Sequence, residues 1–238
     1  MITTFSYDDL ESLGSSYIED KNKNSSYYFE GKRLPRVTEI ISKMIEEKSI
    51  ILWANSLGFE GRDYQKVLDY YADLGTRTHN GIECFLRKEE VPSETPYFPY
   101  TSFLNWWEAF NKIHKTEIMY IEEPLISPYC GGTLDFLLKV DNKVYLIDFK
   151  TSKHITYKYF LQLAAYRMML RDFKEINIDC AMILQVAKDK LQYKEYIYDL
   201  SVEENKKNMD IYERTFMALV YAYNHIMYLE EQFKNIWE

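Results

Sequence analysis

Residues 131–150 decide the fold of this chain, and they run GGTLDFLLKV (131–140), DN (141–142) and KVYLIDFK (143–150). The apolar stretches 133–140 and 143–149 have the length and composition of buried β-strands. Asp141 and Asn142 tolerate positive φ better than most residues, so they can close a two-residue turn. We therefore predict an antiparallel hairpin, with Gly131-Gly132 as a turn before its first strand.

The turn fixes which residues of the hairpin face each other. If Val140 lies opposite Lys143, then Asp135 lies opposite Asp148, with both side chains on one face. Facing Cβ atoms are about 4.5–5.5 Å apart, and like charges there are destabilising. Two carboxylates at this range call for a cation or a shared proton. Alternation along the second strand puts Lys150 on the same face and turns Phe149 into the core.

The hairpin thus predicts a site for Mg²⁺ or Mn²⁺, the ions that carboxylates prefer. The alternative is a surface hairpin whose Asp and Lys side chains form ordinary salt bridges. The flanking residues Leu134, Phe136, Leu146 and Ile147 favour a buried hairpin. Because buried charges are costly unless compensated, burial favours the metal site.

The remaining periodicity predicts an α/β sandwich with a mixed sheet. Before the hairpin we expect a β-ribbon at 27–29, a loop at 91–100, a strand at 117–126, and helices at 37–44, 50–57, 64–87 (broken near Gly75) and 101–114. After it we expect a helix at 155–171, strands at 178–187 and 193–198, and a helix at 203–237. Residues 1–115 would form a mainly helical N-terminal portion and 116–238 the core with its C-terminal helix, together making one compact unit.

Composition limits the function classes. The chain has 238 residues, 47% of them hydrophobic, which allows a packed core. Its net charge of −8 argues against a protein that coats nucleic acid by bulk charge, but allows a local basic channel. Residues 148–174 carry six basic and two acidic side chains, consistent either with such a channel or with a solvated helix face. The 22 Tyr and 13 Phe are expected mainly in packing, with stacking on bases as the alternative.

Localisation and other chemistries can be judged from what the sequence lacks. Cys84, Cys130 and Cys180 form no CxxC pair, so we expect buried thiols in a reducing compartment and no zinc or iron–sulfur cluster. Residues 1–9 lack a signal-peptide pattern and no long apolar run exists, which predicts a cytoplasmic protein with no membrane partner. There is no GxxxxGK[ST] run for a nucleotide-driven motor and no GxSxG for acyl transfer.

At this point the motifs resemble a family, the PD-(D/E)xK nucleases, and most closely the branch of the RecB nuclease domain and the phage and mitochondrial genome-maintenance exonucleases. The likeness covers roughly residues 35–190. It rests on four motifs in order: VTEII (37–41) followed by Trp53-Ala54, GTRTH (75–79), GTLD (132–135) with DFKTS (148–152), and QLAAY (162–166). The chain departs from the family pattern in having Leu134 before Asp135 instead of proline, which is common in this branch. It also lacks the four-cysteine cluster of some relatives.

The resemblance implies a restriction-endonuclease-like core and a set of roles. His79, Asp135, Asp148 and the carbonyl oxygen of Phe149 would hold Mg²⁺ or Mn²⁺, and Lys150 would position water or stabilise developing charge. Thr151, Gln162 and Tyr166 would contact the phosphate backbone, or Gln162 and Tyr166 would orient the lysine. The implied activity is a DNA exonuclease acting on single-stranded ends in replication, repair or recombination, leaving 5′-phosphate and 3′-hydroxyl ends. The likeness to phage enzymes also suggests a phage origin.

Other readings stay open. A structure-specific endonuclease, or a non-catalytic nucleic-acid-binding subunit of a recombination complex, would fit the same fold. The sequence leaves undetermined the polarity, DNA or RNA preference, oligomeric state and protein partners, and whether Glu83 joins the site. We expect Gly81 to allow another backbone to approach. At Glu122 and Glu123 we expect edge charge, with contact of one of them with the site as the alternative. Ordinary roles are expected at His114, His154 and His225, and packing of the N-terminal lobe by Trp53, Trp106 and Trp107.

Overall fold

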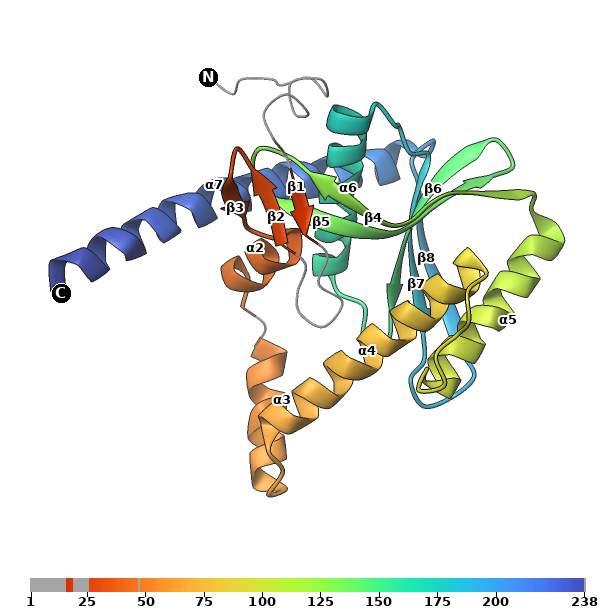
Figure 1. Ribbon diagram of the computed structural model, residues 1–238, viewed down its shortest axis with the longest axis horizontal. Coiled ribbons are helices and arrows are strands. Elements are labelled where there is room, and N and C mark those ends of the chain that lie inside the picture. Colours follow the sequence, from red (N-terminus) through yellow and green to blue (C-terminus); the bar gives the residue numbers. More distant parts are fainter. Residues whose placement is uncertain (1–15, 19–25, 47, 238) are drawn as a thin grey trace.

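The computed structural model describes residues 16–18, 26–46 and 48–237. The expectation about residues 1–9 lies outside these ranges. The elements in chain order (Figure 1) are β1 (Ser16–Ile18), β2 (Ser26–Phe29), β3 (Lys32–Leu34), α2 (Val37–Met44), α3 (Lys48–Phe59), α4 (Tyr64–Arg87), α5 (Tyr97–Ile113), β4 (Thr116–Ile126), β5 (Gly131–Val140), β6 (Lys143–Lys150), α6 (Tyr157–Lys174), β7 (Cys180–Val186), β8 (Tyr193–Asp199) and α7 (Glu203–Trp237).

The central sheet has five strands in the order β4-β5-β6-β7-β8. Strands β6 and β7 are parallel, and the other neighbouring pairs are antiparallel. A parallel neighbour cannot be reached by a tight turn, and α6 forms the crossover between β6 and β7. The predicted mixed sheet flanked by helices is therefore confirmed. A second, three-stranded sheet of β1, β2 and β3 contains the expected ribbon.

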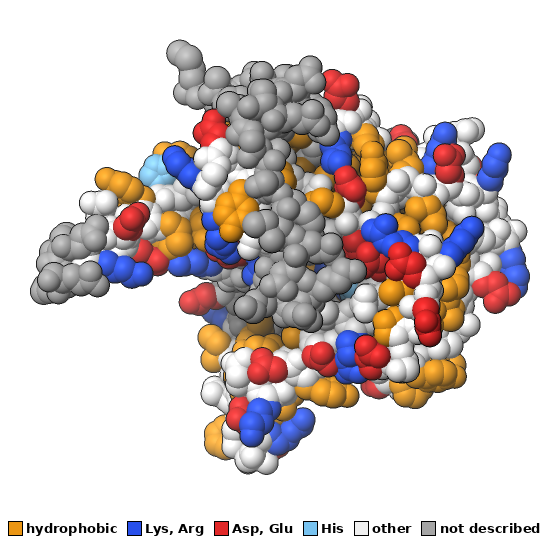
Figure 2. All heavy atoms as spheres, in the orientation of Figure 1, with side chains coloured by type: hydrophobic (Ala, Val, Ile, Leu, Met, Phe, Trp, Pro, Cys, Tyr) orange, Lys and Arg blue, Asp and Glu red, His pale blue; other side chains and the backbone are white. Residues whose placement is uncertain are grey.

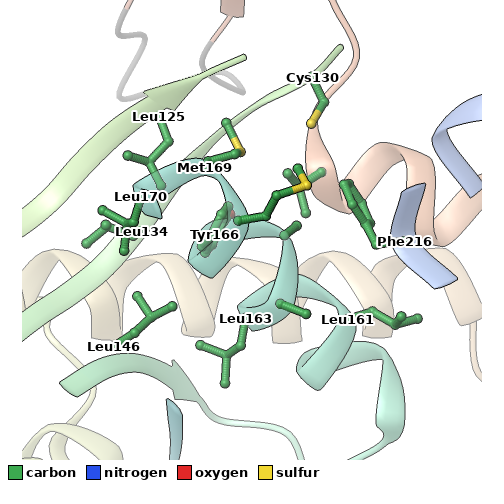
Figure 3. Close-up of a cluster of buried hydrophobic side chains, with 14 of the residues drawn as sticks. Leu125, Cys130, Leu134, Leu146, Leu161, Leu163, Tyr166, Met169, Leu170 and Phe216 are labelled. Atoms are coloured by element: carbon green, nitrogen blue, oxygen red, sulfur yellow. The ribbon is translucent and has the colours of Figure 1, made fainter. Parts of the chain in front are cut away.

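Helices α2, α6 and α7 cover one face of the central sheet (Figure 1). Figure 3 shows the cluster between them, with Leu134 and Leu146 from the sheet and Leu163, Met169 and Leu170 from α6. Helix α6 is buried nearly all round, because the sheet lies on one side of it and α2 and α7 on the other. This explains why polar residues of α6 do not gather on one side of the helix.

Helices α4 and α5 cover the opposite face. Ile82 of α4 and Phe103 and Trp106 of α5 pack against Phe136 and Phe149 of the sheet. Strands β5, β6 and β7 are thus buried on both faces, which requires apolar residues at successive positions. The alternation sends Phe149 into this second cluster, as predicted.

Several element boundaries differ from the sequence expectations. Helix α5 begins at Tyr97, within the expected loop, because Pro99 lies in the first turn, where its missing N–H would have no helical partner. Residues Gly131 and Gly132 belong to β5 and pair with Ile126 and Leu125, so they do not form a turn. Helix α6 begins at Tyr157 and continues to Lys174.

The glycines of α4 do not interrupt it. Helix α4 continues through Gly75, where the expected break is absent, since one internal glycine costs only about 1 kcal/mol. A Cβ at Gly81 would lie 2.3 Å from Cγ2 of Thr95. Gly81 therefore makes room for the side chain of Thr95, in the loop after α4. The expectation that another backbone approaches Gly81 is wrong.

Two groups of residues expected in packing can be placed. Cys130 and Cys180 are fully buried, whereas Cys84 is half-buried. The Trp106 indole is 1% exposed and donates to Oε1 of Glu195 at 2.6 Å, and the Trp53 ring contacts Tyr64 of α4. None of the helices in the described part of the chain combines the length and the apolar character needed to cross a membrane.

Candidate metal centre

The hairpin has the register that the sequence predicts. Val140 pairs with Lys143, and the pairing continues to Phe136 opposite Ile147. Beyond that point the backbone N–H of Phe149 donates to Oδ2 of Asp135 at 2.7 Å, so a side-chain carboxylate accepts its hydrogen bond in place of a strand carbonyl. Both acids are buried, Asp135 at 8% and Asp148 at 1% exposure. The strand ends therefore hold two carboxylates away from bulk water.

His79 reaches the same point from α4. Its Nε2 lies 3.0 Å from the carbonyl oxygen of Phe149, to which it donates in the tautomer with a proton there. Its Nδ1 lies 3.5 Å from Oδ2 of Asp135 and 3.8 Å from Oε1 of Glu122. A hydrogen bond from one ring nitrogen is what orients a histidine whose other nitrogen binds a metal. The carbonyl oxygen of Phe149 thus lies on the Nε2 side of the ring, away from an ion bound at Nδ1, and its expected role as a ligand stays a prediction.

Glu122 completes a group at this point, although the sequence favoured edge charge for it over contact with the site. The ligand atoms of His79, Glu122 and Asp135 all lie within 4.8 Å of one another, so this group of one buried and two half-buried side chains could hold a metal ion. Ligands on opposite sides of Mg²⁺ are about 4 Å apart, so the group needs only a small contraction. One nitrogen and two carboxylates suit Mn²⁺ and Mg²⁺ better than a soft metal. The expectation of edge charge is therefore corrected for Glu122.

The neighbouring Glu123 behaves as expected, forming an ion pair with Lys174. The difference arises in the backbone of β4, where the register against β5 shifts between Ile118 and Tyr120 and Glu122 has φ of 47°. A left-handed conformation is costly for a non-glycine residue and often occurs at functional sites. Arg87 of α4 helps to hold this segment, since its Nη2 donates to the carbonyl of Ile121 at 2.7 Å. Strand alternation alone could not have shown which glutamate faces His79.

Lys150 and Asp148 form a buried pair beside this group. The ammonium of Lys150 lies 2.6 Å from Oδ2 of Asp148, with side-chain exposures of 16% and 1%. Neither oxygen of Asp148 has a well-directed hydrogen bond within the described residues. Lys150 also lies over the ring of Tyr159, at 5.2 Å from its centroid. Asp148 is adjacent to the His79–Glu122–Asp135 group but is not part of it, and its expected role as a ligand stays a prediction.

The protonation of these groups is strongly coupled. Burial raises the pKa of Glu122 to about 7, against the lowering effect of His79, and raises the pKa of Asp148 to about 6, against that of Lys150. Burial also acts to raise the pKa of Asp135, but the charges of His79 and Lys150 outweigh it and the pKa is lowered. Burial alone would lower the pKa of His79, yet Asp135 and Glu122 raise it well above 6.5. An excess of acidic groups thus favours a cation here.

The predicted substrate-binding residues have different surroundings. Gln162 and Tyr166 are buried on α6, and the Gln162 amide donates to the Tyr166 hydroxyl at 3.3 Å. The Tyr166 ring lies against Gly132, where a Cβ would be 2.5 Å from Cε1 of the ring. Thr151 is half-buried and faces Gly75 of α4. Burial limits Tyr166 to contacts through the cleft that it lines.

A cleft of about 1300 Å³ opens over the centre. Its described lining includes His79, Glu122, Asp135, Lys150, Gln162 and Tyr166 but not Asp148 or Thr151. Arg36, Arg77 and Arg87 add positive charge to the lining, and Asp73, Glu83 and Glu89 add negative charge. Charged side chains of both signs are interspersed on the face in Figure 2.

The basic stretch of the sequence is not a channel along α6. Arg167 pairs with Asp210 and Glu213 of α7, and Arg171 pairs with Glu213 and Asp172. Within the described cleft lining, Lys150 is the basic residue that this stretch contributes. Glu83, left undecided from the sequence, forms an ion pair with Arg87 at 2.9 Å. His114 and His225 have partners away from the centre, Asp141 and the carbonyl of Tyr221.

No family model and no curated protein matches this chain. A search of solved structures finds the crystal structure of SSO0001 similar, with 13% sequence identity and a TM-score of 0.29 over 74% of this chain and 83% of that one. A likeness at this level carries no argument about function. The case for a function therefore depends on the residues themselves.

Proposed function

We propose that this chain is a metal-dependent deoxyribonuclease with a PD-(D/E)xK core, hydrolysing phosphodiester bonds at the ends of single-stranded DNA. The observation that carries the proposal is the meeting of four chemically suited side chains from three elements. His79 comes from α4, Asp135 from β5, and Asp148 and Lys150 from β6. They lie where β5 and β6 part, next to a cleft large enough for a nucleotide strand.

The residues present fit a hard divalent cation. His79, through Nδ1, Glu122 and Asp135 would hold Mg²⁺ or Mn²⁺, with the carboxylate of Asp148 beside them. When bound, such an ion polarises a phosphate oxygen and lowers the pKa of water. Glu122 adds a ligand to the set that the family resemblance implies.

The chain's own groups would carry the rest of the reaction. The ammonium of Lys150 is held by Asp148, and the pKa of Lys150 is raised by Asp148 and Asp135 even though burial acts to lower it. It therefore stays charged near neutral pH and can stabilise negative charge that develops on the phosphate oxygens. Water oxygen forms the new bond to phosphorus, and the bond to the departing 3′ oxygen breaks. The water gives up its proton to the solvent that fills the cleft, and the departing 3′ oxygen takes up a proton from the same solvent. Asp148 does not line the cleft, and its part is to hold the Lys150 ammonium.

Gln162 and Tyr166 would shape the cleft around the scissile phosphate. Both are more than nine-tenths buried yet line the cleft, so their polar atoms are presented without free rotation. The close approach of Tyr166 to Gly132 fixes its ring relative to β5. Such preorganised donors cost little to arrange when the substrate binds.

The test is cleavage of end-labelled single- and double-stranded DNA by wild type and by Lys150→Ala, with Mg²⁺, Mn²⁺ or EDTA. Lys153→Ala is the matched control, because Lys153 is a nearby exposed lysine outside the cleft lining. We expect cleavage by wild type and Lys153→Ala with either metal, and a loss of about 10²–10³-fold in Lys150→Ala. Cleavage in EDTA, or an undiminished rate without Lys150, would overturn the mechanism. Cleavage of circular single strands, which have no ends, would show that the protein is an endonuclease and not an exonuclease.

A further inference from the structure

Arg36 is anchored next to the start of β5. It forms a parallel bridge with Gly131, and the N–H of Gly131 donates to the carbonyl of Pro35 at 3.0 Å. The carbonyl of Arg36 accepts from the N–H of Ile40 at 3.0 Å, in the first turn of α2. From Gly131 to Asp135 is four residues of strand, roughly 13 Å. Arg36 is therefore held at a fixed distance from the candidate metal centre.

Within the described part of the chain, the guanidinium of Arg36 has only a long ion pair, with Glu39. Its Nε is buried and has no hydrogen bond within the described residues. The nearest acid, Glu39, lies 4.0 Å from this atom and is engaged by Arg33 at 3.2 Å and by the hydroxyl of Tyr223 at 2.6 Å. A buried donor left without an acceptor costs free energy, and guanidinium groups suit phosphate oxygens well. Arg36 also lines the cleft.

The neighbouring part of the cleft suits an anion better than a cation. Thr38, Thr133 and Gln162 line it together with Arg36, and all three are uncharged. The acidic lining residues belong to α4, the loop after it, β4 and Asp135 of β5. Arg36 is the first residue before α2 and makes no side-chain cap, so the positive end of that helix adds to the potential at Arg36.

We propose that Arg36 binds a backbone phosphate of the DNA strand, one or two nucleotides from the bond that is cut. This inference rests on the proposed function. Because the backbone of Arg36 lies beside Gly131, roughly 13 Å of strand from Asp135, the side chain would meet a neighbouring phosphate of the strand rather than the scissile one. Arg36 would be a positioning residue that sets the register of the strand over the metal centre.

The first experiment compares two arginines that share one acid. Arg33 and Arg36 both pair with Glu39, but Arg33 is about half exposed and lies outside the described cleft lining. Binding of a fluorescent single-stranded oligonucleotide is measured by anisotropy in Mg²⁺ on the Lys150→Ala background, so that the strand stays intact. We expect Arg36→Gln to weaken binding about tenfold and to reduce the salt slope by about 0.7, and Arg33→Gln to leave both unchanged. Equal effects of the two substitutions, or none, would overturn the inference.

The second experiment identifies the phosphate. Single linkages of the oligonucleotide are replaced in turn by uncharged methylphosphonates, and each is tested with and without Arg36→Gln. One linkage near the cleavage point is expected to weaken binding to the Arg36 protein but not to the variant. The same loss in both proteins at every linkage would contradict the proposal. If wild type cleaves DNA through Lys150 but Arg36→Gln behaves as Arg33→Gln, this inference fails and the nuclease assignment stands. If wild type neither binds nor cleaves DNA, both fail.

Discussion

Phe149 and Asp135 are joined by a hydrogen bond of 2.7 Å in which the backbone N–H of Phe149 donates to Oδ2 of Asp135. The carbonyl of the same residue faces the imidazole of His79. One peptide segment of β6 therefore orients a carboxylate on β5 and a ring on α4. Orientation by backbone groups is stiff, because it depends on the sheet rather than on side-chain rotamers.

Asp135→Asn should remove the central negative charge while keeping the shape of the side chain. The amide oxygen can still accept from Phe149, so the fold should survive. We expect the affinity for Mn²⁺, measured by calorimetry, to fall at least about tenfold. Glu123→Gln is the control, since Glu123 pairs with Lys174 outside the centre. Unchanged Mn²⁺ affinity in Asp135→Asn would show that the ion binds elsewhere or not at all.

Glu122→Gln should weaken Mn²⁺ binding by a comparable factor, because Glu122 lies in the group that could hold the ion. This prediction separates the present ligand set from the one implied by family resemblance, which does not include Glu122. Calorimetry on Glu122→Gln, Glu123→Gln and wild type gives the answer. If Glu122→Gln matches wild type while Asp135→Asn does not, Glu122 is a neighbour of the ion and not a ligand.

The metal-free protein should lose stability as pH rises. The pKa values of Asp148 and Glu122 are raised by burial to about 6 and about 7, above unfolded values of about 4. Their protonated forms stabilise the fold at low pH, and this contribution is lost as pH rises through 6 and 7. His79 acts in the same direction, since its pKa is also raised, whereas the lowered pKa of Asp135 adds stability that is constant above about pH 4.

Thermal unfolding between pH 5 and 8, in EDTA and in Mn²⁺, tests this prediction. In EDTA the melting temperature should fall across the range. The increase produced by Mn²⁺ should grow with pH, because the ion needs the ionised carboxylates and neutral imidazole. An increase by Mn²⁺ that is the same at pH 5 and pH 8 would contradict the assignment of these groups as ligands.

Gly132→Ala should destabilise the fold, because its Cβ would lie 2.5 Å from the ring of Tyr166. We expect a loss of about 1–3 kcal/mol in the free energy of unfolding, measured in urea. Gly58→Ala in α3 is the matched control. Its Cβ meets nothing within 4 Å, so it should be neutral or stabilise by up to about 1 kcal/mol. Equal stability of the two variants would mean that Tyr166 moves aside freely.

The sequence was informative where local rules apply. A two-residue turn determined the hairpin register, and that register brought Asp135, Asp148 and Lys150 together. It was not informative about Glu122, because the irregularity of β4 reverses what simple alternation would give. The start of α5 was missed for a similar reason: Pro99 discourages a helix in general but not in a first turn. The sequence left open whether the charges of α6 form a channel, because α7, which pairs with two of its arginines, is remote in sequence.

The left-handed backbone of Glu122 has a consequence for how this protein could change. Replacing Glu122 by glycine would relax that backbone while removing a carboxylate from the centre, so greater thermal robustness and weaker ion capture would come from one substitution. Variants selected only for heat resistance would then tend to lose the glutamate at position 122. Variants selected for ion binding would keep a residue that the backbone conformation by itself disfavours.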